Sequence, residues 1–201
     1  AKGYTEFEPL VYAKTLALDS VVYVLMGGLA LCLQVFTNSK FVGYALLIGV
    51  MVLQGVMGYL DLTHNLYSFG SWPIAPYSDM NGYGHFARAQ LWFQAYWGAL
   101  LLAMLLVAAA FWVRGVAGSG RERLAEAKQR LRGPLGAAVA ASLAVFAGLG
   151  GFLFWNTNVL NEFVPPDEQI ARLVRYETEH QRDQALPQNR RPTAGANTTP
   201  A

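Results

Sequence analysis

Four long apolar runs alternate with polar segments along this chain of 201 residues. The runs cover residues 16–36, 41–60, 91–113 and 135–155. A membrane-spanning helix needs about 20 apolar residues, because each residue advances the helix by about 1.5 Å. Each run has this length, so the pattern predicts four transmembrane helices. The expected fold class is an all-α membrane protein with a structured loop between the second and third helices.

The segments between the runs differ in length and composition. Residues 37–40 are so few that the first two helices should form a tight antiparallel hairpin. Residues 61–90 form a long loop that is rich in aromatic, glycine and proline residues. Residues 114–134 are basic, and the stretch 121–132 predicts a short helix that lies on the membrane surface.

The two ends of the chain are more polar than its middle. Residues 1–15 mix aromatic and acidic side chains and predict an interfacial lead-in. This lead-in starts at Ala1 and lacks the basic start and short apolar core of a signal peptide, so we expect the chain to be a piece of a longer polypeptide. In the tail, 156–201, the prolines and acids at 165–168 predict a helix over about 166–180. The residues that follow it are expected to be disordered.

Composition and charge support a membrane protein and give it an orientation. The chain is 54% hydrophobic and only 14% charged, whereas soluble domains average about 25% charged residues. Six basic residues lie in 114–134 and Lys40 lies in the first turn, but the long loop holds only Arg88. Basic residues favour the cytoplasmic side. The rule therefore predicts both termini and the 61–90 loop on the extracytoplasmic side.

The 61–90 loop concentrates the candidate chemistry of the chain. Asp61, His64, Asp79 and His85 are potential metal ligands, but their spacing matches no metal-binding motif. The alternative is that they hydrogen-bond the loop backbone, so no catalytic, cofactor-binding or metal-ligating residue is assigned. We expect the loop to form a rigid cap, with Tyr67, Trp72, Tyr77 and Tyr83 packed at the membrane interface. Its candidate structural or functional residues are His64, Asn65, Tyr67, Tyr77, Ser78, Asp79, Asn81, Gly82, Tyr83 and His85.

The basic segment has two interpretations. It could anchor the chain on anionic lipid, which contributes about 1 kcal/mol for each basic residue near the surface. It could instead dock a cytoplasmic partner such as an ATPase. The glycine-rich stretch 115–122 lacks the lysine and hydroxyl residue of a nucleotide-binding loop. The residues proposed for docking or lipid contact are Arg121, Arg123, Lys128, Arg130 and Arg132.

Polar side chains also occur within the apolar runs. Asp19 and Gln34 lie close enough to a helix end to reach the interface, whereas Gln54 is the deepest of them. Polar groups inside a membrane are candidates for function. Gln54 could hydrogen-bond a neighbouring helix or line a translocation path.

Several stretches resemble one bacterial family of large membrane proteins. The most specific are HNLYSFG at 64–70 and PYSDMNGYGHF at 76–86, followed by LWFQAYW at 91–97. Further similar stretches are GYTEFEPLVYAKTL at 3–16, NSKFVGY at 38–44, FAGLGGFLFWNTNVLNEF at 146–163 and YETEHQRDQALPQ at 176–188. The family joins an ABC exporter-type permease to a C-terminal zinc aminopeptidase of the aminopeptidase N-like class. The chain resembles the C-terminal part of the permease region, over residues 3 to about 188.

The resemblance implies a multi-pass protein of the bacterial inner membrane. Its expected partners are the lipid bilayer, a cytoplasmic ABC ATPase, the remainder of the permease and the peptidase domain, with no nucleic acid. Neither the HExxH zinc helix nor the GxMEN motif occurs in this sequence, so no catalytic residue carries over and zinc is expected only in the peptidase domain. Two functions follow as expectations for this non-enzymatic chain. It is a transport component, or alternatively a membrane anchor and scaffold for an extracytoplasmic peptidase.

Overall fold

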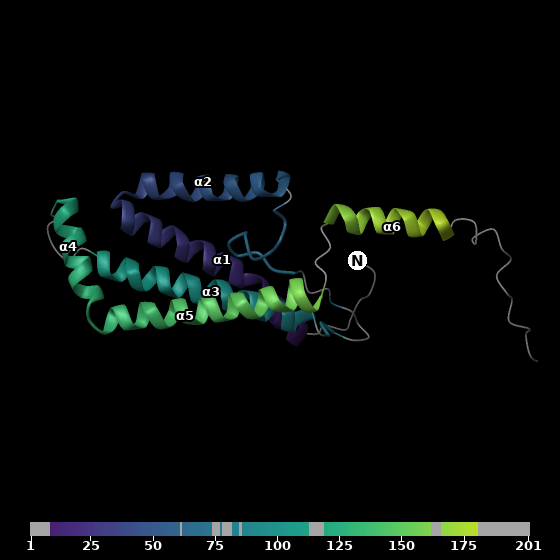
Figure 1. Ribbon diagram of the computed structural model, residues 1–201. Helices are drawn as coiled ribbons and strands as arrows, with labels where there is room; N and C mark the ends of the chain where they lie inside the picture. The colour runs from purple at the N-terminus through teal and green to yellow at the C-terminus, as the bar shows by residue number, and fades with distance from the viewer. Residues whose placement is uncertain are drawn as a thin grey trace, which may run out of the picture. The chain divides into compact units, whose positions relative to one another are not determined.

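The computed structural model describes residues 9–60, 62–73, 77, 82–84, 86–112, 119–161 and 166–180. The chain divides into two compact units, Ala1–Phe163 and Val164–Ala201. The first unit holds six helical elements and the second holds one (Figure 1). They are α1 (Pro9–Thr37), α2 (Lys40–Tyr59), α3 (Phe86–Phe111), α4 (Gly120–Leu131), α5 (Pro134–Phe154), the π-helix η1 (Trp155–Leu160) and α6 (Pro166–His180).

Four helices are long and apolar enough to cross a membrane, as the sequence predicts. They are α1 with 29 residues, α2 with 20, α3 with 26, and α5 continued by η1 with 27. No β-strand occurs in the described part of the chain. The predicted all-α membrane fold is therefore confirmed. The short helices α4 and α6 lie where the sequence predicts helices over 121–132 and about 166–180.

The helices extend beyond the apolar runs. Pro9 opens α1, well before the predicted start at residue 16, and proline is well suited to the first position of a helix. At about 1.5 Å per residue, α1 is about 44 Å long, enough to cross the hydrocarbon core and both headgroup regions. Part of the predicted lead-in is therefore helix. Likewise α3 begins at Phe86, and the fourth helix continues as η1 to Leu160.

The core of the first unit is built around α3, which packs against α1, α4 and α5. Tyr96 of α3 stacks on Phe146 of α5 with ring centroids 4.4 Å apart and an angle of 18° between the planes. Ser142 Oγ of α5 also donates a hydrogen bond to the Ala99 carbonyl, at 2.8 Å. Aromatic stacking and an interhelical hydrogen bond together fix the α3–α5 pair, which the apolar pattern alone did not reveal.

The α1–α2 hairpin depends on one close backbone approach. Asn38 has a φ of 51°, a left-handed conformation that asparagine tolerates, and Ser39 caps α2 by accepting a hydrogen bond from the Val42 N–H. The chain then places Gly43 directly against Gln34 of α1. A Cβ at Gly43 would lie 2.6 Å from Gln34 Cγ and 2.9 Å from Gln34 Cα. Only glycine fits here without moving a backbone.

Gly43→Ala should therefore destabilise the hairpin by about 1–3 kcal/mol, the usual cost of overpacking. Thermal unfolding of the detergent-solubilised protein, followed by circular dichroism, measures this loss. Gly49→Ala is the matched control, because a Cβ on Gly49 of the same helix meets nothing within 4 Å. Equal melting temperatures for the two variants would contradict the assigned contact.

At one end of this unit α4 runs across the ends of the long helices (Figure 1). Its start is a capping box, in which Ser119 Oγ accepts from the Glu122 N–H and Glu122 Oε2 accepts from the Ser119 N–H. Pro134 then opens α5 after a short turn. The crossing helix thus joins α3 to α5 and closes this end of the unit.

The second unit contains α6, which spans the residues predicted for it. Glu168 and Arg172 form an ion pair one turn apart, with 2.8 Å between Oε1 and Nη2. Ile170, Leu173 and Val174 are exposed and share one helix face. The predicted disorder after this helix falls on 181–201, outside the described residues.

Candidate functional site

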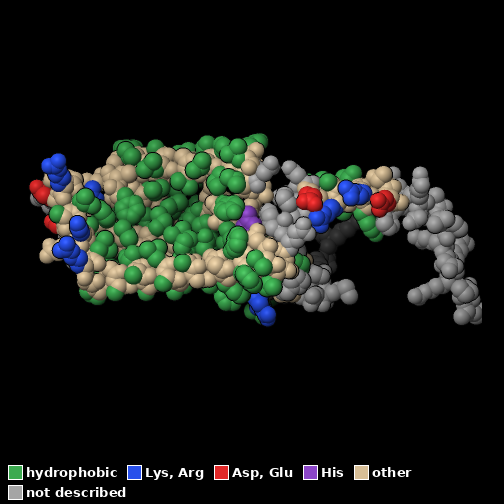
Figure 2. Space-filling model, viewed as in Figure 1, with side chains coloured by type: hydrophobic (Ala, Val, Ile, Leu, Met, Phe, Trp, Pro, Cys, Tyr) green, Lys and Arg blue, Asp and Glu red, His purple; other side chains and the backbone are tan. Residues whose placement is uncertain are grey.

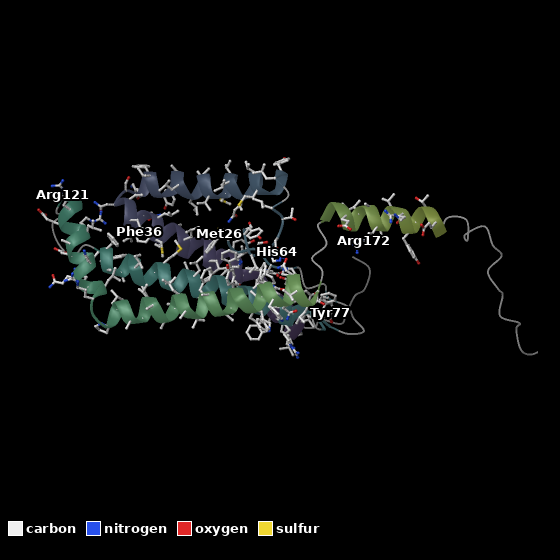
Figure 3. All side chains as sticks on the ribbon, in the orientation of Figure 1. Met26, Phe36, His64, Tyr77, Arg121 and Arg172 are labelled. Carbon is white, nitrogen blue, oxygen red and sulfur yellow. The ribbon has the colours of Figure 1, made fainter. Side chains whose placement is uncertain are left out.

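Two candidate regions lie at opposite ends of the first unit. One is the loop between α2 and α3, marked by His64, and the other is the basic helix α4, marked by Arg121 (Figure 3). Figure 2 shows apolar side chains over the long helices and basic side chains gathered over α4. The sequence singled out both regions, and the structure shows which of their residues act together.

His64 attaches the loop to the end of the fourth span. Its side chain is buried, its Nδ1 accepts the Leu66 N–H at 3.1 Å, and its Nε2 lies 3.1 Å from Thr157 Oγ1. Because Nδ1 is an acceptor, the neutral ring carries its proton on Nε2 and donates it to Thr157. Thr157 in turn donates to the Leu153 carbonyl at 2.8 Å, and Asn158 Nδ2 donates to Thr157 Oγ1 at 3.0 Å. The result is a continuous hydrogen-bonded chain from the loop to α5.

The π-helix η1 brings this pair of residues to the ring. Its turn is wider than that of an α-helix, so the neighbouring side chains of Thr157 and Asn158 diverge less and both reach His64. Asn161 Nδ2 closes the turn by donating to the Asn156 carbonyl at 2.8 Å. Single π turns are rare and often occur at functional sites. Asn156 and Asn158 therefore lie in this π-helix, and Asn161 directly follows it.

Further contacts hold the middle of the loop on α2 and α3. The Phe69 ring packs edge-on against Trp97, with centroids 5.3 Å apart, and Trp97 Nε1 donates to the Ser71 carbonyl at 3.0 Å. Gln54 Nε2 of α2 donates to the Phe69 carbonyl at 3.1 Å. Its described partner is the loop backbone rather than a neighbouring helix, which differs from the predicted bond between helices. Gly70, at a φ of 74°, lets the loop approach α1 closely.

The remaining described loop residues make separate contacts, some within the loop and one with α1. Asn65 Oδ1 accepts a hydrogen bond from Ser71 Oγ at 2.6 Å. The Tyr77 and Tyr83 rings meet edge-on at 5.3 Å, and the Tyr83 hydroxyl hydrogen-bonds Thr15 of α1. Gly82 has a φ of 58°, in the left-handed region that favours glycine.

The four aromatic side chains expected at the membrane interface differ in how far the protein itself buries them. Trp72 packs against the core and Tyr83 is half-buried, but Tyr67 is 54% exposed and Tyr77 is 41% exposed. Tyr67 still contacts the His64 ring, with centroids 5.7 Å apart. The other predicted residues of the loop, Ser78, Asp79, Asn81 and His85, lie outside the described residues.

Two buried glutamines of α3 do not stand out in the sequence. Gln94 Nε2 donates to the Leu18 carbonyl of α1 at 2.7 Å, and Gln90 Nε2 lies 3.4 Å from the same oxygen. Both side chains are buried. The signal that could have found them is their spacing of four residues at the start of an apolar run, which places both on one helix face.

The structure describes His64 alone among the four potential metal ligands of the loop, since Asp61, Asp79 and His85 lie outside the described ranges. Within those ranges no three His, Cys, Asp or Glu side chains lie close enough together to hold a metal ion. The described contacts of His64 are hydrogen bonds to the loop backbone and to η1.

Burial lowers the pKa of His64 below its ordinary value of about 6.5. The closed loop holds the neutral ring, whereas an opened loop takes up a proton once the pH falls below that ordinary value. The closed state therefore loses stability as the pH falls from about 6.5 toward the lowered pKa, and is unaffected above it.

Amide hydrogen exchange in residues 62–73 should accordingly report this titration. We expect protection to fall by up to about tenfold for each pH unit in that window, after correction for intrinsic exchange. His64→Gln should make the protection independent of pH, and His180→Gln, in the other unit, should leave the wild-type profile unchanged. A profile that survives His64→Gln would assign the titration to another group.

At the opposite end, Arg123 of α4 binds the ends of two long helices. Its Nη2 donates to the Val35 carbonyl of α1 at 2.8 Å and lies 3.5 Å from the Phe111 carbonyl of α3. These carbonyls belong to the last turns, where no backbone N–H is available within the helix. A cation there also interacts favourably with the helix dipole. Arg123 is thus a structural clamp.

Arg130 also donates hydrogen bonds to carbonyl groups at a helix end, but only to the end of α3. Its Nη1 donates to the Ala110 carbonyl at 3.1 Å and to the Trp112 carbonyl at 2.9 Å, and its Nη2 pairs with Glu126 at 3.5 Å. The five basic residues predicted for docking or lipid contact therefore divide into two groups. Arg123 and Arg130 hydrogen-bond the ends of long helices and hold α4 in place, although Arg130 is also partly exposed. The other group comprises the exposed side chains of Arg121, Lys128 and Arg132.

Arg123→Ala should lower the free energy of unfolding by about 1.5–3 kcal/mol, because it removes charge-assisted hydrogen bonds to helix ends. Arg121→Ala removes the same charge from the exposed face of the same helix and should change stability by less than about 0.5 kcal/mol. Thermal unfolding in detergent compares the two variants. If both melt at the same temperature, Arg123 does not clamp the helix ends.

Comparison of the chain with protein-family models, with curated proteins and with solved structures gives no significant match.

Proposed function

We propose that this chain is the C-terminal part of an ABC exporter-type permease of the bacterial inner membrane, and that it docks a cytoplasmic ATPase through α4. The observation that carries the proposal is the exposed basic face of α4, formed by Arg121, Lys128 and Arg132. These cations sit on a helix that is itself clamped to α1 and α3. A rigid charged element at the end of a helical unit suits contact with an acidic partner surface.

Further support comes from the distribution of charge. Lys40 opens α2 directly after the α1–α2 turn, so the basic residues at both of these connections belong to the side expected in the cytoplasm. The resemblance of 64–70 and 76–86 to the permease–aminopeptidase family points to the same function.

Association with an ATPase is the test of this proposal. The full chain is cross-linked in native membranes, purified in detergent and analysed by mass spectrometry. We expect an ABC ATPase to copurify with the wild type. Combined reversal of Arg121, Lys128 and Arg132 to Glu should reduce its recovery at least about tenfold, since each reversed rim charge adds repulsion.

Arg175→Glu is the control, because Arg175 is an exposed arginine of α6 in the other unit. It should leave recovery of the ATPase unchanged. Failure to recover an ATPase with the wild type, or equal recovery with the triple variant, would refute docking through α4.

A second function is favoured by α6. Its exposed face of Ile170, Leu173 and Val174 has the spacing of a helix that packs against another surface. This supports the alternative of a membrane anchor and scaffold for an extracytoplasmic zinc aminopeptidase, without transport. Copurification of a peptidase without an ATPase would favour that alternative.

A further inference from the structure

A surface cavity of about 350 Å³ lies where the end of α1, the start of α2 and the end of α3 meet. Its polar lining comes from Gln34, Asn38, Ser39, Lys40 and Arg123. No acidic residue is among the described residues that line it. The cavity is therefore cationic and rich in hydrogen-bond donors.

The described residues place no carboxylate on the charges of the cavity, although the Lys40 ammonium lies 5.1 Å from the centre of the Phe41 ring. Neither Lys40 nor Arg123 forms an ion pair with a carboxylate in the described ranges. Arg123 uses Nη2 on helix carbonyls, but its Nε is buried and has no hydrogen-bond partner among the described residues. A buried N–H of a charged group without an acceptor is costly. Arg123 thus brings to the cavity a guanidinium group that no described carboxylate neutralises.

Lys40 gives an independent indication, because its position is unfavourable for the helix. It is the first residue of α2, where the helix dipole is positive and a cation is destabilising. The first N–H groups of α2 also lack acceptors within the helix. Lysine and helix dipole repel each other here, and both would be stabilised by one anion bound between them.

The rest of the lining indicates what kind of anion fits. Leu31, Val35, Phe111 and Trp112 bring apolar surface to the same cavity. They belong to the last turns of α1 and α3 and to the residue that follows α3, so the cavity lies at the end of the apolar spans. A small inorganic ion would leave this apolar surface unused, whereas a phospholipid places a phosphodiester beside the start of its acyl chains.

We propose that this cavity binds the phosphodiester of an anionic phospholipid from the adjoining leaflet. Lys40, Arg123 and the first amides of α2 contact the phosphate, and the apolar wall contacts the upper acyl chain. The bound lipid supplies the negative charge that the described lining of the cavity lacks. The site is independent of whether α4 docks an ATPase.

The full-length chain, purified in neutral detergent, is titrated with phosphatidylglycerol and, separately, with phosphatidylcholine. Native mass spectrometry gives the affinity of the first lipid bound, and thermal unfolding gives the stabilisation. We expect phosphatidylglycerol to bind more tightly and to raise the melting temperature more. Lys40→Gln should weaken its binding about fivefold, the effect of one basic residue near an anionic surface.

Arg121→Gln is the matched control, because it removes one exposed positive charge from the same end of the protein without touching the cavity. It should bind phosphatidylglycerol as the wild type does. Lys40→Gln should fold at least as well as the wild type without lipid, since it removes a cation from a helix N-terminus. Its reduced affinity would thus not reflect unfolding.

A titration with inorganic phosphate in place of lipid distinguishes a site for a phospholipid headgroup from a site for a soluble phosphate compound. Stabilisation by phosphate that disappears in Lys40→Gln would support the anion site and assign it to a soluble phosphate compound. Equal losses of phosphatidylglycerol binding in Lys40→Gln and Arg121→Gln would show only general surface attraction and overturn the proposal. Equal binding of the two lipids by the wild type would overturn it as well.

Discussion

The backbone carbonyl and amide groups at the ends of membrane helices need hydrogen-bond partners, and this requirement organises the first unit. Unsatisfied backbone groups are costly wherever water is scarce. At one end, Arg123 and Arg130 reach the terminal carbonyls of α1 and α3. At the other end, Gln54 and Trp97 bond carbonyls of the loop. Polar side chains on the helices thus decide where the irregular segments can lie.

The packing of the four spans depends on the central helix α3 and on the contacts of Gly43 and Gln54. Because α3 carries most of the buried residues, α1 and α5 pack on it from different sides, while α2 packs on α1. Only 6% of the most apolar window of α2 is buried, against 44% for α3, so α2 relies on Gly43 and on the loop contact of Gln54. Most of α2 therefore lies on the surface of the unit, and its contacts with α1 and with the loop hold it there.

The sequence predicted the spans well because length and hydropathy are local properties. It could not predict that Arg123 and Arg130 point at helix ends while Arg121 stays exposed, because all three lie on one short basic helix. The partners of Gln54 and His64 were equally hidden, since they are separated from these residues by 15 and 93 positions along the chain. The π turn of η1 has no periodic signature in the sequence either.

The clamps of α4 also have a mechanical consequence. Anything that pulls α4 away from the bundle must break the bonds of Arg123 to α1 and α3 and those of Arg130 to α3 at nearly the same time. The direct connection of α4 to α5 through the turn at Gly133 adds a third helix. A push or pull on this one short helix is therefore shared by α1, α3 and α5, whereas it reaches α2 indirectly, through α1 and through the loop contact of Gln54. The α4 helix thus couples α1, α3 and α5, so that a local force on α4 displaces these three spans together.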